Sequence, residues 1–102
     1  MIHVVAVITA KPGMRETILG HFRANVPACR AEQGCIEYGA AVDLDNGPPS
    51  HTKWGADTFL VIEKWESLDA LKAHAASAHM AAYAAKTKEF IANRAVHILS
   101  PT

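Results

Sequence analysis

Hydrophobic residues along the chain follow two spacings, and the changes between them predict the order of the elements. Consecutive or alternating apolar residues are typical of strands, and apolar residues three or four apart are typical of helices. The predicted strands are residues 2–10, 35–44, 58–65 and 95–99. The predicted helical regions are residues 14–32 and a region from residue 67 that breaks near residue 77, before a further segment from His79. The order is therefore β-α-β-β-α-β.

The stretch from Thr58 to His79 organises this pattern. Its first half is apolar on consecutive positions, which suits a central strand covered on both faces. Helical spacing begins at Ser67, a residue type favoured at helix N-caps. We expect any chemistry to occur where this strand and this helix face each other.

The element order favours an α+β fold with a four-stranded antiparallel sheet and helices on one face. The chain has 102 residues, which suits a single domain spanning residues 1–102. The strands are apolar on both faces, so one face would remain an exposed apolar patch. We therefore predict a homodimer that packs sheet on sheet. The long loop over residues 45–57 carries Trp54, which we expect to anchor the loop or contact the partner rather than bind substrate.

Charge and cysteine content narrow the class of protein. Ten basic and ten acidic residues cancel, and no basic run stands out, so neither a nucleic-acid nor a membrane partner is expected. Cys29 and Cys35 match neither a C-x-x-C redox motif nor a zinc pair. We interpret them as reduced thiols of a cytoplasmic protein. A redox pair would need the helix end and the next strand to place them side by side.

Two histidines, His74 and His79, are the first candidates for chemistry. Two metal ligands on one helix face need a spacing of three or four, whereas these are five apart with no evident third ligand. No metal site is therefore expected. His74 lies three residues after Leu71 and so flanks the buried stripe. It is either a hydrogen-bonded, half-buried histidine, which spacing alone favours, or a proton-transferring group at a cavity edge.

Glu63 shares a strand face with Trp65 and apolar neighbours. A carboxylate there must be paired or have a shifted pKa, as a structural ion pair or as an acid or base in a pocket. Trp65 and Tyr38 are either core residues or flat walls for an aromatic substrate. The sequence contains no G-x-S-x-G elbow, phosphate loop or Rossmann fingerprint, so no tightly bound nucleotide cofactor is expected.

Residues 32–38, 61–67, 71–74 and 79–83 resemble the antibiotic biosynthesis monooxygenase (ABM) domain family, in particular its YgiN-type quinol monooxygenases. The resemblance implies a ferredoxin-like fold, a dimeric α/β barrel and a cavity between sheet and helices. It further implies oxidation of a quinol or polycyclic phenol by O2 without metal or flavin, so that no cofactor is needed. The catalytic positions carried over are His74, Trp65 and Tyr38, and the substrate-binding positions are Glu63, His79, Tyr83 and Phe22.

The sequence differs at three positions from the haem-degrading members of the family that it resembles. Ala6 stands where they place an asparagine, Ala84 where they place a haem-ligating histidine, and His74 where they place a tryptophan. Haem degradation is therefore not expected. Two alternatives to the quinol monooxygenase stay open: an isomerase or other proton-transfer enzyme acting on a small carbonyl metabolite, and a non-catalytic dimeric ligand-binding or stress-response protein.

Overall fold

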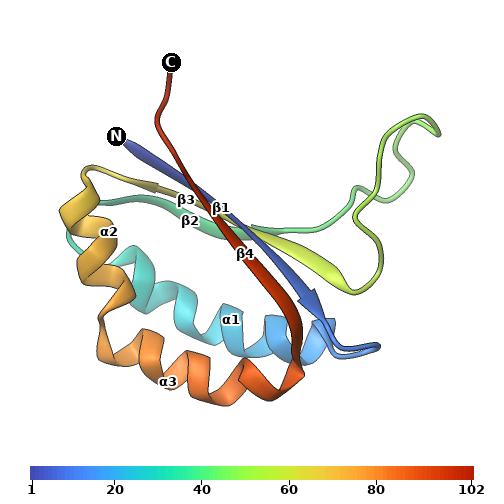
Figure 1. Ribbon diagram of the computed structural model, residues 1–102, viewed down its shortest axis with the longest axis horizontal. Helices are drawn as coiled ribbons and strands as arrows, with labels where there is room; N and C mark the ends of the chain where they lie inside the picture. Colours follow the sequence, from blue (N-terminus) through green and yellow to red (C-terminus); the bar gives the residue numbers. More distant parts are fainter.

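A computed structural model describes residues 1–102, and its elements follow the expected order. They are β1 (Ile2–Ala10), α1 (Arg15–Arg30), β2 (Cys35–Ala41), β3 (Thr58–Trp65), α2 (Leu68–Ala75), α3 (Ala78–Thr87), a 3-10 turn η1 (Lys88–Phe90) and β4 (Ile91–Leu99). The strands form one antiparallel sheet in the order β2-β3-β1-β4. All three helices lie on the same side of it (Figure 1). The predicted ferredoxin-like α+β class is confirmed.

Strand β1 shows how the two faces of the sheet differ. Val4, Ile8 and Ala10 point to the helices and are almost fully buried, whereas Val5 and Val7 between them are only half-buried. Side chains alternate along a strand, so these two sets face opposite sides. The helices therefore cover one apolar set and leave the other uncovered.

Two serines set the break between α2 and α3. Ser67 caps α2 by accepting a hydrogen bond from the backbone N–H of Ala70 at 3.1 Å. Ser77 caps α3 by accepting from the N–H of Met80 at 3.4 Å, and its hydroxyl donates to the carbonyl of His74 at 2.8 Å. Side-chain oxygens of this kind satisfy amide groups that a helix start leaves unpaired. The break near residue 77 is confirmed, although α3 begins at Ala78 rather than at His79.

The first helix ends earlier than the sequence predicts. It stops at Arg30, with Ala31 as its cap, instead of reaching residue 32. Gly34 lies in the turn that follows and has a φ of +84°, which favours glycine. A Cβ at Gly34 would lie 2.6 Å from the Cβ of Ala70, so the turn also needs glycine for the close approach of α2.

Two strand boundaries also differ from the prediction. Strand β2 ends at Ala41 rather than at residue 44, because the carboxylate of Asp43 accepts the N–H groups of Trp54 and Gly55 at 3.0 and 2.8 Å and closes the loop. Strand β4 begins at Ile91 rather than at residue 95, because it pairs with β1 along its whole length. The extra residues of β4 include Arg94, which bears on the site below.

The segment between β2 and β3 projects beyond the end of the sheet (Figure 1). Trp54 within it is 58 % exposed, so the chain leaves more than half of this residue uncovered. Its expected roles as loop anchor or partner contact stay predictions. None of the helices combines the length and the hydropathy needed to cross a bilayer.

Candidate functional site

His74 occupies the centre of the candidate site, in the last turn of α2. It is 4 % exposed, and its Nδ1 lies 2.8 Å from Oε1 of Glu32, which follows α1. A carboxylate can only accept a hydrogen bond, so this contact assigns the proton to Nδ1. In the neutral ring, the Nε2 atom of His74 then carries a free lone pair. The geometry of α2 and of Glu32 together thus presents an imidazole nitrogen able to accept a proton.

Glu63 of β3 lies on the other side of the same ring. Its Oε1 is 3.8 Å from Nε2 of His74 and accepts a hydrogen bond from the indole N–H of Trp65 at 2.9 Å. Burial raises the pKa of Glu63 above its usual value, and the Trp65 hydrogen bond, His74 and Arg94 partly offset this effect. Glu63 is therefore a buried acid held in place beside a base.

Aromatic rings fix the position of His74. The Trp65 ring centroid lies 4.6 Å from that of His74, and the Tyr38 centroid lies 5.3 Å away on an edge-on approach. Phe22 stacks on Tyr38 at 5.4 Å with an interplanar angle of 12°. Burial raises the pKa of the Tyr38 phenol far above its usual value, so this hydroxyl stays neutral. Trp65 and Tyr38 thus form a rigid frame around the imidazole.

A cavity of about 410 Å³ opens beside His74, between the β1–β4 side of the sheet and helices α2 and α3. Its walls are mostly hydrophobic and include Val4 and Ala6 of β1, Val96 and Ile98 of β4, and Ala84 of α3. Its polar lining residues are Glu63, Lys72, His74 and Arg94. An apolar hollow with a few convergent polar groups is typical of small-molecule sites.

A second hollow of about 350 Å³ lies between α1 and the edge strand β2. It contains Arg23 and Arg30 but no acid–base pair. Arg30 is already engaged, since its guanidinium donates to the carbonyl of Tyr38 at 3.0 Å. The chemistry that a catalytic site needs is therefore concentrated in the first cavity.

The structure separates the sequence-derived candidates into two groups. Glu63 and His74 line the cavity, and Trp65 and Tyr38 lie buried behind them. The other three do not line it. Phe22 is in the core, and His79 and Tyr83 line a groove of about 200 Å³ between α1 and α3.

Sequence reasoning did not single out three of the residues that complete the site. Glu32, which orients His74, is one of several charged residues off the apolar stripe of the first helix, and its spacing gives no signal of its role. Lys72 appears as an ordinary exposed helical lysine. Arg94 was missed because the last strand was expected to begin after it.

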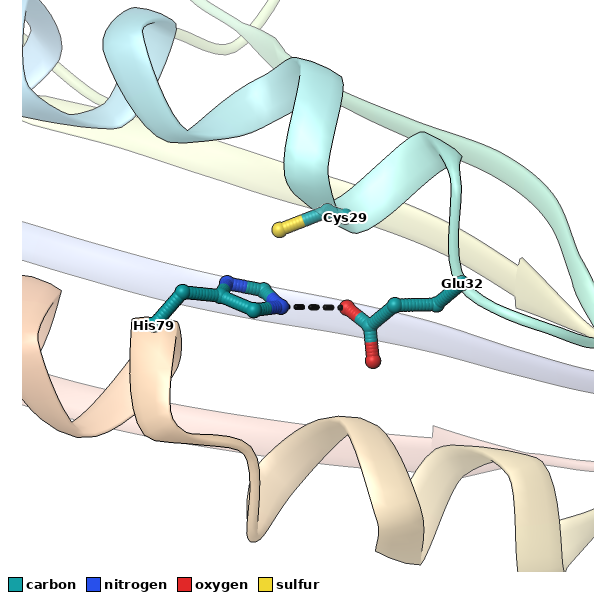
Figure 2. A group of neighbouring side chains, drawn as sticks. All are labelled: Cys29, Glu32 and His79. Carbon is teal, nitrogen blue, oxygen red and sulfur yellow. Dashed lines mark ion pairs between the residues drawn. The ribbon is translucent and has the colours of Figure 1, made fainter.

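Cys29, Glu32 and His79 form a separate cluster between α1 and α3 and point toward one another (Figure 2). One potential ligand atom from each lies within 4.8 Å of the others, and thiolate, carboxylate and imidazole are all zinc ligands. The spacing argument considered His74 with His79, and so did not reach this cluster.

Two features indicate that this cluster holds the His74 imidazole in place rather than binding a metal. Burial raises the pKa of the Cys29 thiol to about 11, which keeps it protonated near neutrality. The Glu32 oxygen that contacts His79 at 3.0 Å is the same atom that holds His74, so a metal would compete with His74 for it. The His79 Nε2 is close to that oxygen without an aligned hydrogen bond, while its Nδ1 faces the Asn25 amide oxygen at 3.2 Å.

Comparison with known proteins identifies the family. The family described as "Antibiotic biosynthesis monooxygenase" matches residues 1–86. The Escherichia coli (strain K12) protein "Probable quinol monooxygenase YgiN" is 35 % identical, over 99 % of this chain and 98 % of its own length.

Solved structures agree in fold with this chain. PA3566 from Pseudomonas aeruginosa is 27 % identical with a TM-score of 0.82, over 99 % of this chain and 93 % of its own. Rv0793 from Mycobacterium tuberculosis is 25 % identical with a TM-score of 0.81, over 99 % of this chain and 94 % of its own. The sequence match and the shared fold together establish that this chain belongs to the antibiotic biosynthesis monooxygenase family.

Proposed function

We propose that this chain is a monooxygenase that oxidises a quinol or polycyclic phenol with O2 inside the 410 Å³ cavity. The observation that carries the proposal is His74, whose Nδ1 is held by Glu32 at 2.8 Å while its other nitrogen faces Glu63 at the cavity wall. The family assignment and the similarity to YgiN support the reaction class. The apolar walls support a flat aromatic substrate.

His74 acts as general base in this reaction. A substrate hydroxyl placed at Nε2 gives up its proton, and the imidazolium that forms lies between the carboxyl groups of Glu32 and Glu63. The Glu32 carboxylate, which contacts the ring at 2.8 Å, stabilises the new positive charge. The resulting phenolate is a far better electron donor than the neutral phenol. The substrate itself can then reduce O2.

The electrons balance without an external reductant. A quinol has two more electrons and two more protons than its quinone, so one quinol and one O2 yield a hydroxylated quinone and one water. O2 accepts four electrons, two from the conversion of quinol to quinone and two from a ring C–H bond that breaks. One oxygen atom takes the place of that hydrogen as a new C–OH group, and the other leaves as water with two protons. We therefore propose that neither a metal nor a flavin takes part.

We propose that the working unit is a homodimer formed by the uncovered sheet face. That face carries apolar side chains from three strands, namely Val5 and Val7 of β1, Leu60 and Ile62 of β3, and Leu99 of β4. Ile62 and Leu99 are 37 and 48 % exposed. A second copy with the same twist is the simplest complement to a flat apolar sheet. Because Cys29 and Cys35 are both free thiols, we also propose a reducing compartment, the cytoplasm.

Oxygen uptake with 1,4-dihydroxynaphthalene tests the activity. We expect the protein to raise uptake above the spontaneous rate and to yield the ring-hydroxylated quinone by mass spectrometry. His74→Gln should lower kcat by about 100-fold or more. Uptake equal to the protein-free rate, or unaffected by His74→Gln, would remove the proposal. Quinone with hydrogen peroxide as the only products would show an oxidase instead.

A proton-transfer enzyme is the second candidate, favoured by one observation. Glu63 has a raised pKa and sits 3.8 Å from the basic nitrogen of His74, so an acid and a base face one site together. Such a pair can move a proton between adjacent carbons of a small carbonyl compound. This candidate predicts turnover under anaerobic conditions, which the monooxygenase does not. Ligand retention without any conversion would instead indicate a binding protein.

A further inference from the structure

Two cationic side chains at the cavity, Arg94 of β4 and Lys72 of α2, have no partner within the chain. The buried polar groups beside them are paired locally, in the Glu32–His74 and Trp65–Glu63 contacts. Neither cation makes an ion pair or a side-chain hydrogen bond. A guanidinium directed to an apolar cavity is suited to bind a planar anion. Building on the proposed function, we propose that the substrate is an aromatic alcohol with a carboxylate, and that Arg94 binds this carboxylate.

The sheet register attaches Arg94 and Glu63 to the sheet at different positions along β1. Arg94 pairs across the ladder with Ile8, while Glu63 pairs with Val4 on the opposite edge of β1. Positions 4 and 8 are about 13 Å apart along a strand. Side chains reaching inward from both places shorten this span to about the length of a two-ring aromatic. The hydroxyl and the carboxylate should therefore lie at opposite ends of the ring system.

The charges around the cavity agree with an anionic ligand. Glu63 is the acidic lining residue, and its burial raises its pKa toward the neutral form. Arg94 and Lys72 line the same cavity, and Arg94 partly offsets the effect of burial on the pKa of Glu63. Arg94 also lies close to Tyr83, whose buried phenol has its pKa raised to about 12 and so stays neutral. An approaching carboxylate thus meets two cations and one buried acid whose pKa is raised.

Binding of a matched pair of ligands tests this inference. The probes are 6-hydroxy-2-naphthoate and its methyl ester, which have the same rings and hydroxyl but differ in charge. Titration by naphthol fluorescence or calorimetry should give the acid at least about tenfold tighter binding than the ester. Because Arg94 is solvent-exposed, added salt should weaken binding of the acid and leave binding of the ester unchanged.

Variants assign the effect to Arg94. Arg94→Gln should lower the affinity for the acid by about tenfold and leave the affinity for the ester unchanged. Lys72→Gln should lower the affinity for the acid by a smaller factor. Arg94→Lys should retain most of the affinity for the acid. Lys88→Gln removes an exposed cation that does not line the cavity and should change nothing. Unaltered melting temperatures confirm that each variant is folded.

Several results would overturn the inference. The first is equal affinity of the native chain for the acid and the ester. The second is an equal loss of affinity for both probes in Arg94→Gln. The third is that neither probe binds at millimolar concentration. Binding requires no oxidation, so the two proposals fail separately. A chain that binds the acid through Arg94 yet never consumes O2 supports this inference and removes the monooxygenase. A chain that oxidises neutral quinols and binds the acid no better than the ester supports the monooxygenase and removes this inference.

Discussion

The two faces of the sheet are built from the same kind of residue, yet they have different surroundings. On the helix-covered face, Phe59 and Trp65 are completely buried and the polar groups Glu63 and His74 are held by specific partners. On the uncovered face, Ile62 is 37 % exposed, and Glu37 forms an ion pair with Lys64 at 3.1 Å. Burial on the covered face strengthens each polar contact, whereas the polar contact on the other face is exposed to solvent and its apolar side chains are only partly covered. The proposed chemistry and the proposed association therefore use opposite sides of one sheet.

The sharpest test substitutes neighbouring residues of β1 that point to opposite faces. Ile8→Asp places a carboxylate in the buried core and should destabilise the fold by more than about 3 kcal/mol. Val7→Asp should leave the chain folded but abolish its association, since the charge would lie in the sheet-on-sheet contact. Thermal melts followed by circular dichroism measure the first effect, and sedimentation mass measures the second.

Two outcomes of that experiment would break the comparison. A native mass equal to one chain at micromolar concentration would show that the uncovered face has no partner copy. A Val7→Asp protein with unchanged mass would show that association, if present, uses another surface. Val7→Thr is the matched control, because it keeps the shape of the side chain without adding charge.

The second prediction compares Glu32, which contacts His74 on the helix-covered side of the sheet, with Glu37 on the uncovered face. Glu32→Gln keeps an oxygen near His74 but removes the charge that stabilises the imidazolium, so kcat should fall by about 10- to 100-fold with little change in KM. Glu37→Gln removes a carboxylate from the uncovered face and should change neither value.

A loss confined to KM in Glu32→Gln would assign Glu32 to substrate binding instead of to the positioning of His74. Equal losses in the Glu32 and Glu37 variants would indicate a general electrostatic effect. Either result would mean that the base is not organised by the carboxylate that the geometry assigns to it.

The covered face also shows what sequence reasoning could and could not reach. Alternating apolar residues predicted β1 with its bounds, and Ser67 marked the start of the second helical region, because both signals depend on neighbours in sequence. Glu63 and His74 were recognised as unusual polar residues on apolar faces. The Glu32–His74 contact joins residues 42 positions apart, and no local pattern encodes such a pairing.

The errors have local causes as well. The loop after β2 starts early because Asp43 accepts two backbone N–H groups from residues 54 and 55, a closure that the composition of the loop does not reveal. Arg94 was placed outside the last strand because charged and polar residues interrupt its apolar pattern. The register of β4 against β1 is what directs Arg94 to the cavity.

The third prediction uses the buried acid of the covered face. The folded-state pKa of Glu63 is raised above its ordinary value of 4.5, mainly by burial. A group with a raised pKa contributes stability below its ordinary value and loses that contribution as the pH rises through the folded value. Glu63→Gln cannot ionise but can still accept the Trp65 hydrogen bond. Its melting temperature should therefore exceed that of the native chain near pH 8, and the difference should shrink toward about pH 4.

Glu89→Gln is the control for this pH series, since Glu89 is exposed and should behave like the native chain at every pH. A Glu63→Gln protein that is less stable than the native chain near pH 8 would show that the Glu63 carboxylate is ionised and stabilising there. The acid–base pair would then be an ion pair, which weakens the case for a proton-transfer reaction in particular.

The smallest expected effect concerns Cys29, Glu32 and His79, which lie between the helices on the covered side of the sheet (Figure 2). The Cys29 pKa of about 11 and the engagement of Glu32 by His74 both oppose metal binding, so EDTA should leave O2 uptake unchanged and Cys29→Ser should alter it by less than about twofold. One equivalent of zinc should not raise the melting temperature. A zinc-dependent rise that His79→Ala removes would instead identify a metal centre. In that case Glu32 would be a metal ligand, and the orientation of His74 would depend on whether the metal is bound.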